Sequence, residues 1–250
     1  MRIVETVGVF LIGVLIFASC KEEVAPIPEE EPTNYVKIEV DPMFDTEVLH
    51  LDSVYTTQEG YDIKFLEIRF YMENVRNGST SLIDAGLFDY RARGTTLLRA
   101  EGKGTDFGSL QANLGVGATN NHSDPSAFPS ESMLNILNAN DMHWTWSPGY
   151  IFVKVEAKVD TIPDGTALFN HNVVFHAGLD ANLQTMSFNN LSWTTVGNED
   201  VLRLKLDMGL FLNGSQTIDV KDESSTHSAP GQEALTLKVM TNFKESLTLY

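Results

Sequence analysis

The sequence is poor in cysteine and in positive charge. Cys20 is the one cysteine among 250 residues, so the chain cannot form an intramolecular disulfide or a metal site of several thiolates. Lysine and arginine number 17 against 34 aspartate and glutamate residues, which gives a formal net charge of −17. Nucleic acids and anionic membrane surfaces bind clustered Lys and Arg, so neither is predicted to be a partner.

The motifs of several common enzyme classes are also missing. The sequence contains no Gly-rich phosphate loop, no G-x-S-x-G nucleophile elbow and no His-Glu-x-x-His metal motif. Carboxylates are abundant, but their spacing does not identify an acid–base pair, because such pairs are defined by geometry. The sequence therefore predicts a protein without catalytic activity.

The N-terminal segment has no apolar run long enough to span a bilayer by itself. Residues 7–18 are apolar apart from two glycines and follow a single arginine, which is typical of a secretory signal peptide over residues 1–19. The small residues just before Cys20 resemble the processing site of a bacterial lipoprotein, in which Cys20 is acylated. This predicts an outer-membrane lipoprotein, facing the periplasm or the cell surface and attached through its lipid alone.

Residues 20–34 are rich in Glu and Pro and predict a flexible tether. Residues 35–250 consist of short alternating runs separated by turn residues, which predicts one all-β domain, an antiparallel β-sandwich with long loops at one end and little helix. The alternation changes phase between Phe65 and Leu66, which predicts a β-bulge. Strands are expected at residues 35–40, 61–75, 82–83, 95–99, 110–116, 151–159, 167–177, 184–194, 201–212, 217–221, 234–240 and 247–250.

Six histidines are the candidate metal ligands, although none has the spacing of a zinc helix or finger. His122 and His143 fall within or just after the longest irregular region, residues 117–140, where a short helix is expected at residues 130–138. His176 lies next to a predicted turn, and loops at one end of a β-sandwich commonly carry its binding site. His227 lies in a polar Ser/Thr-rich loop and is predicted to be solvated.

Two tryptophans, Trp144 and Trp146, follow His143 directly. They could be a pair of core or rim aromatics. Alternatively, side chains two residues apart in extended backbone point the same way and could form a platform on which a sugar ring stacks. Composition does not separate these two interpretations.

Three segments together resemble a known family. They occur in the order Asn121-His122-x-Asp124-Pro125, then Met142-x-Trp144-Thr145-Trp146, then Phe175-His176-x-Gly178, and they are similar to the MbnP-like copper-binding domain. Residues 69–75 and 82–84 are similar to that family too, so the similarity covers most of the domain.

The resemblance implies a secreted β-sandwich that binds copper near its loop end, in a lipid-anchored protein of the cell envelope. In the methanotroph members, histidines hold the copper together with a kynurenine, which a di-haem peroxidase-like partner makes by oxidising a tryptophan. Imidazoles suit both copper oxidation states. Carried over to this sequence, the resemblance implies His122 and His176 as first ligands, His143 as an additional candidate, and Trp144, Trp146 and Asp124 as residues that line the site or are modified.

The competing hypothesis needs no metal. A surface lipoprotein could bind a glycan or a protein through a platform of Trp144 and Trp146 with the neighbouring loops. Such binding would be indifferent to chelators, whereas copper binding would depend on the histidines.

Overall fold

The longest strand, β4 (Asp62–Asn77), runs through the middle of the larger sheet. Its first part pairs with β8 (Ile151–Asp160) and its second part with β5 (Thr80–Asp89), both antiparallel. The register with β8 shifts between Phe65 and Glu67, which confirms the predicted bulge. The shift keeps Ile63 and Phe65 buried before it and lets Ile68 and Phe70 be buried after it, as one uninterrupted alternation could not.

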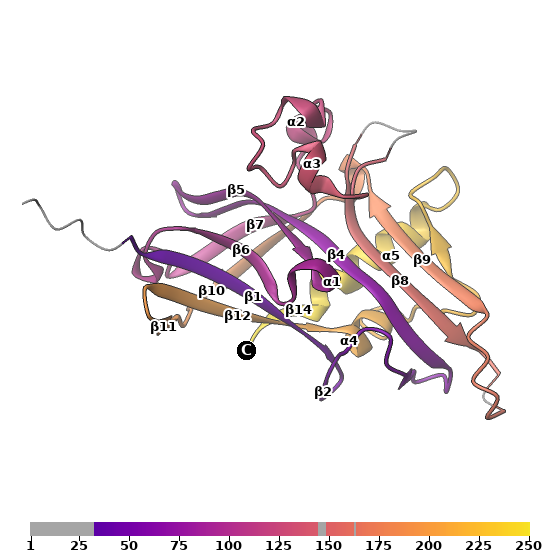
Figure 1. The fold of residues 1–250 in the computed structure, drawn as a ribbon. Coiled ribbons are helices and arrows are strands. Elements are labelled where there is room, and N and C mark those ends of the chain that lie inside the picture. Colours follow the sequence, from indigo (N-terminus) through magenta and orange to yellow (C-terminus); the bar gives the residue numbers. More distant parts are fainter. Residues whose placement is uncertain (1–32, 145–148, 163) are drawn as a thin grey trace, which may run out of the picture. The chain divides into compact units, whose positions relative to one another are not determined.

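The computed structural model describes residues 33–144, 149–162 and 164–250, and two sheets carry most of the fold (Figure 1). The all-β prediction of two packed sheets is confirmed. The predicted signal peptide, Cys20 and most of the predicted tether lie outside the described residues. The smaller sheet contains β1 (Tyr35–Phe44), β2 (Glu47–Val48), β6 (Thr96–Glu101), β11 (Thr194–Val196), β12 (Glu199–Asp207) and β14 (Leu247–Leu249). The larger sheet adds β3 (Tyr55–Thr56), β7 (Ser109–Leu114), β9 (His171–Gly178), β10 (Gln184–Asn189) and β13 (Ser225–Thr226) to β4, β5 and β8.

Helices are short except for the last one. The α-helices are α1 (Tyr90–Arg93), α2 (Ala118–Asn121), α3 (Ile136–Ala139), α4 (Met208–Leu212) and α5 (Glu233–Ser246), and the 3-10 turns are η1 (Gly104–Asp106), η2 (Pro125–Ala127) and η3 (Asp180–Asn182). No helix in the described ranges has the length and apolar character needed to cross a membrane.

Several local predictions were wrong. Residues 234–240, predicted as a strand, belong to α5, because alternation over Leu235, Leu237 and Val239 also fits a helix whose apolar positions continue to Phe243. Residues 217–221 are not a strand, and the strand predicted over 201–212 ends where α4 begins. The loop helix is α3 rather than residues 130–138, and its N-cap is Asn135.

The direction of two strand pairs also differs from the predicted antiparallel sandwich. Among the strand ladders of the described residues, β1 with β12 and β13 with β9 are parallel, while the others are antiparallel. Hydrophobic alternation reports which side chains share a face and carries no information on direction. The second parallel pair matters for function, because β13 leads directly into His227.

Helix α5 contributes aromatic packing to the core. The Phe243 ring lies 5.3 Å from the Phe70 ring of β4 and 5.7 Å from Phe211 of α4, measured between centroids. Phe211 in turn lies 6.1 Å from Phe175 of β9. This chain of rings connects the C-terminal helix to the strand that carries His176.

Replacing Phe243 tests this connection. Phe243→Ala removes a fully buried ring and should lower the free energy of unfolding by about 3–5 kcal/mol, the usual cost of such a cavity. Urea denaturation measures the change. Leu237→Ala in the same helix is the matched control, since Leu237 is 49% exposed and its loss should change stability by less than about 0.5 kcal/mol. Equal effects of the two variants would contradict the packing described for α5.

Candidate metal site

The tryptophan motif forms two short extended segments that lead into β8. His143 and Tyr150 form an antiparallel bridge, and Trp144 N donates to Gly149 O at 3.1 Å. Ile151 N donates to the carbonyl of Met142 at 2.8 Å. Trp146 lies in residues 145–148, outside the described part of the chain.

The indole of Trp144 is buried, with 5% of the residue exposed. It lies against Gly178 at the end of β9, where a Cβ atom would come within 2.5 Å of Trp144 Cη2. A side chain packed in this way cannot stack on a sugar from solvent, so the surface platform is wrong for Trp144. The core interpretation of this residue is confirmed, and it brings the indole close to the strand of His176.

Asn121 joins three segments that are distant in the sequence. Its side-chain oxygen accepts a hydrogen bond from Tyr150 N at 2.7 Å, and its amide nitrogen donates to Asp180 Oδ1 at 2.7 Å. The residue is 2% exposed, so both bonds replace contacts with water. The asparagine of the Asn-His motif therefore has a structural role: it fixes the loop after β7 against β8 and the turn after β9.

His122 shares the carboxylate that Asn121 holds. Its Nε2 lies 2.7 Å from Asp180 Oδ2, in a pair that is largely exposed. Burial raises the pKa of Asp180, but the hydrogen bonds from Asn121 and His122 outweigh it and leave that pKa below its ordinary value. Asp180 is thus an anion that orients the imidazole.

Asp124 and His143 lie near each other. Asp124 caps η2 by accepting from Ser126 N at 2.9 Å and Ser126 Oγ at 2.8 Å, and these bonds lower its pKa. The His143 ring packs edge-on against Tyr150 with centroids 4.9 Å apart. Burial lowers the pKa of His143, opposed in part by the charge of Asp124. His143 is therefore biased toward the neutral form that a metal ligand requires.

His176 lies on β9 beside a line of alternating charges on the neighbouring strands. Its Nε2 is 2.8 Å from Glu156 Oε1 of β8, and Lys154 Nζ is 3.4 Å from the same oxygen. Lys154 also pairs with Glu67 of β4 at 2.9 Å. The hydrogen bond with His176 lowers the pKa of Glu156 from 4.5 to about 2. The carboxylate is therefore charged at any ordinary pH.

His227 was expected to be solvated, and that prediction was wrong. Its ring lies 4.9 Å from the ring of His176, with the two planes at 76°. The parallel pairing of β13 with β9 brings it there, and the next residue, Ser228, accepts a hydrogen bond from Gly178 N at 3.0 Å. A two-residue strand has no readable alternation, so the sequence offered no signal for this contact.

The two histidines predicted as first copper ligands thus contact different carboxylates. His176 lies with Glu156 and His227, whereas His122 lies with Asp180. Within residues 33–144, 149–162 and 164–250, no group of three or more His, Cys, Asp or Glu side chains is arranged to hold a metal ion. The contact between His176 and His227 is therefore the best pair of imidazoles for a shared ion.

Comparison with known proteins gives two matches. The family model described as MbnP matches residues 33–228. A solved structure, MbnP from Methylosinus trichosporium, is similar at 17% sequence identity and a TM-score of 0.53, covering 82% of this chain and 88% of that one. At this identity the likeness shows the fold. The chain has no match among proteins with curated descriptions.

The contact between Trp144 and Gly178 can be tested by adding one methyl group. In Gly178→Ala the new Cβ would lie 2.6 Å from the backbone oxygen of Tyr150, which cannot move aside cheaply. We expect a loss of about 1–3 kcal/mol in the free energy of unfolding, measured in urea. The control is Gly108→Ala, where the added Cβ meets nothing within 4 Å. Equal stability of the two variants would be inconsistent with the described packing.

The pair of Glu156 and His176 predicts a pH dependence of stability in the metal-free protein. Because the folded-state pKa of Glu156 is depressed, its contribution is full above pH 4.5 and is lost as the pH falls toward about 2. One pKa unit corresponds to about 1.4 kcal/mol, and partial exposure to water reduces the whole effect to about 1–2 kcal/mol. Glu156→Gln should be less stable by this amount at pH 7, and the difference should shrink toward pH 2.5 in urea denaturation. A difference that is constant with pH would refute the assignment.

Proposed function

This chain belongs to the MbnP family, and we propose that it is a lipid-anchored, non-catalytic copper-binding protein of the cell envelope. Family membership fits a copper-binding role. The observation that carries the proposal is the contact of two imidazoles, His176 and His227, one of which is oriented by a carboxylate.

The carboxylate gives His176 the surroundings of a metal ligand. A metal-binding histidine usually donates its second ring N–H to a carboxylate, a backbone carbonyl or water, which fixes the tautomer and raises the basicity of the nitrogen that faces the metal. Glu156 is placed to accept that bond from His176 Nε2, which leaves Nδ1 for copper. His122 has the same relation to Asp180, whereas His171 Nε2 lies 3.0 Å from a backbone oxygen, that of Val220.

The spacing of the two rings is compatible with one shared ion. With metal–nitrogen bonds of about 2.0 Å, the centroids of two imidazoles on one metal are at most about 6 Å apart. The rings of His176 and His227 are 4.9 Å apart, inside this limit. Burial and the neighbouring His176 lower the pKa of His227, which favours the neutral form that binds a metal.

The tryptophans would complete the site after modification. An indole has no good lone pair to give a metal, whereas kynurenine exposes an aromatic amine and a ketone. Trp144, packed beside the end of β9, and Trp146 are the two candidates for this oxidation by a di-haem peroxidase-like partner. The intact mass of the protein isolated from its native envelope tests the idea, since kynurenine contains one oxygen atom more and one carbon atom fewer than tryptophan.

Copper titration of residue variants tests the binding site. A chain that begins at residue 33 contains all the described strands, and we expect it to bind copper stoichiometrically in competition with a chelator of known affinity. His176→Ala should abolish this binding and His227→Ala should weaken it strongly. Glu156→Gln should weaken it by about 10- to 100-fold, as for other residues that orient a ligand.

His171→Ala is the matched control on the same strand and should bind copper like the parent protein. His122→Ala and His143→Ala test the ligands that the family resemblance implies. Stoichiometric binding that survives the combined loss of His176 and His227 would overturn the proposed pair and return the site to His122 and His143.

A further inference from the structure

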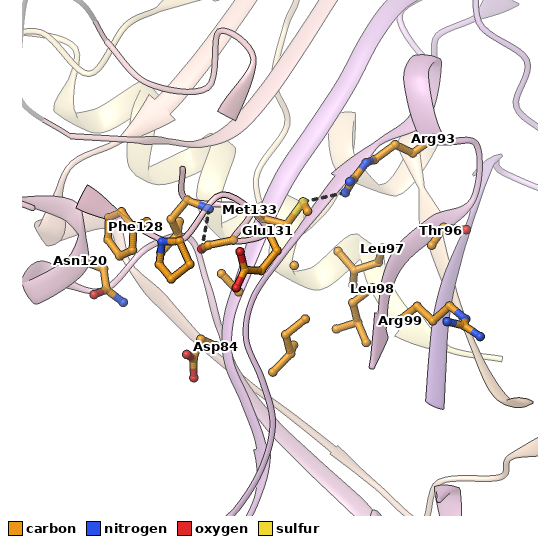
Figure 2. A pocket seen from close by; sticks show the side chains of 16 residues that line it. Asp84, Arg93, Thr96, Leu97, Leu98, Arg99, Asn120, Phe128, Glu131 and Met133 are labelled. Atoms are coloured by element: carbon orange, nitrogen blue, oxygen red, sulfur yellow. Dashed lines mark hydrogen bonds between the residues drawn. The ribbon is translucent and has the colours of Figure 1, made fainter. Parts of the chain in front are cut away.

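A cavity of about 650 Å³ lies between β5 and β6, beneath a covering segment formed by residues 128–134 (Figure 2). The two strands belong to different sheets, since β5 pairs with β4 and β6 pairs with β1. The cavity therefore opens at the seam of the sandwich. Its size is within the range of about 300–1,000 Å³ that is usual for small-molecule sites.

The walls of the cavity are mainly apolar. Leu97 and Leu98 of β6 and Leu134 of the covering segment are buried, while Phe128 and Met133 are half-buried. Apolar side chains left at the border of a cavity of this volume gain contacts when an apolar group enters. The walls alone would fit many apolar molecules, so the charges at the rim must decide the ligand class.

Arg93, at the end of α1, points into one end of the cavity (Figure 2). Its guanidinium donates to Leu87 O at 3.3 Å and to Met133 Sδ at 2.9 Å. A thioether is a weak acceptor. Among the described residues no carboxylate lies within ion-pair distance of Arg93, although the chain has 34 acidic residues.

Two other arginines nearby, Arg91 and Arg99, do have carboxylate partners. Arg91 pairs with Asp52 at 3.0 Å outside the cavity, and Arg99 pairs with Glu199. Arg99 also lines the cavity, but Glu199 balances its charge, and the other charged side chains of the lining are the exposed carboxylates of Asp84 and Glu131. Asp84 lies away from Arg93, across the apolar side chains (Figure 2). A ligand anion is thus repelled by Asp84 and Glu131 and attracted to Arg93, the lining arginine without a carboxylate partner among the described residues.

We propose that this cavity binds an amphipathic carboxylate, with the carboxylate on Arg93 and an apolar chain along Leu97, Leu98 and Phe128. A carboxylate can accept two parallel N–H bonds from a guanidinium, which is stronger and more specific than the bonds Arg93 makes now. The site is independent of the proposed copper ligands, as it uses none of the histidines.

Decanoate is the probe, titrated by calorimetry into the chain that begins at residue 33. We expect saturable binding of one decanoate per chain. Arg93→Gln should weaken it by at least about fivefold, as expected when a charge-assisted bond is lost at a partly exposed site. Arg91→Gln, in the same short helix but paired outside the cavity, should leave the affinity unchanged. Glu131→Gln should strengthen binding, because it removes a repelling charge.

Two further measurements separate the head group from the apolar walls. Decanol, which has the same chain without the charge, should bind more weakly than decanoate and should not respond to Arg93→Gln. Phe128→Asp, in the covering segment, should abolish binding of both molecules, with circular dichroism confirming that the variant is folded. The proposal is overturned if decanoate does not bind, if Arg93→Gln behaves like Arg91→Gln, if decanol binds as tightly as decanoate, or if folded Phe128→Asp still binds decanoate.

Discussion

The pairing of β8 with β9 is the constraint on which the candidate site depends. Its register sets His176 opposite Lys154 and places Glu156 two residues further along the same face. The edge of β9 that faces away from β8 pairs with β13, and this pairing positions His227. The end of β9 leads into Asp180, which holds Asn121 and His122. A slip of one residue between β8 and β9 would turn His176 to the other face and remove it from Glu156.

Near His176, carboxylates on β4 and β8 hold the neighbouring lysine and histidine side chains in place. Lys154 is almost fully buried, and such a cation is tolerated because Glu67 and Glu156 flank it. Glu156 then interacts with both Lys154 and His176. The carboxylate remains ionised because its pKa is depressed, so it accepts a hydrogen bond from His176 rather than donating one. Nε2 of His176 is therefore the donor in this bond, which leaves Nδ1 to face a metal.

How much the sequence predicted depends on whether the signal is local. The bulge at Phe65 could be predicted from the sequence, because a change of phase in the hydrophobic alternation of a strand is explained by one extra residue. The order of three motifs indicated which loops approach one another, and Asn121 indeed joins its own loop to Tyr150 and to the turn after β9. The position of His227 was not readable, since it follows from a two-residue parallel pairing between segments about 50 residues apart. Helix α5 was missed for a different reason, namely that its first residues fit both periods.

Tyr150 connects the candidate metal site to the cavity. Its backbone N–H donates to Asn121, its ring contacts His143, and its hydroxyl donates to the carbonyl of Leu134 in the covering segment. Tyr71 supports the same segment by donating to the carbonyl of Met133 at 3.1 Å. Burial raises the pKa of both phenols well above the ordinary value, so both remain neutral donors.

These two buried phenols fix the covering segment by hydrogen bonds to consecutive carbonyls. An opening of the segment would break both bonds and leave two buried hydroxyls without acceptors, at a cost of about 1–3 kcal/mol each. The cavity wall is therefore preformed rather than assembled by a ligand. The same bonds restrain Tyr150, whose ring restrains His143. The same two tyrosines thus support both the cavity wall and the His143 side of the candidate metal site.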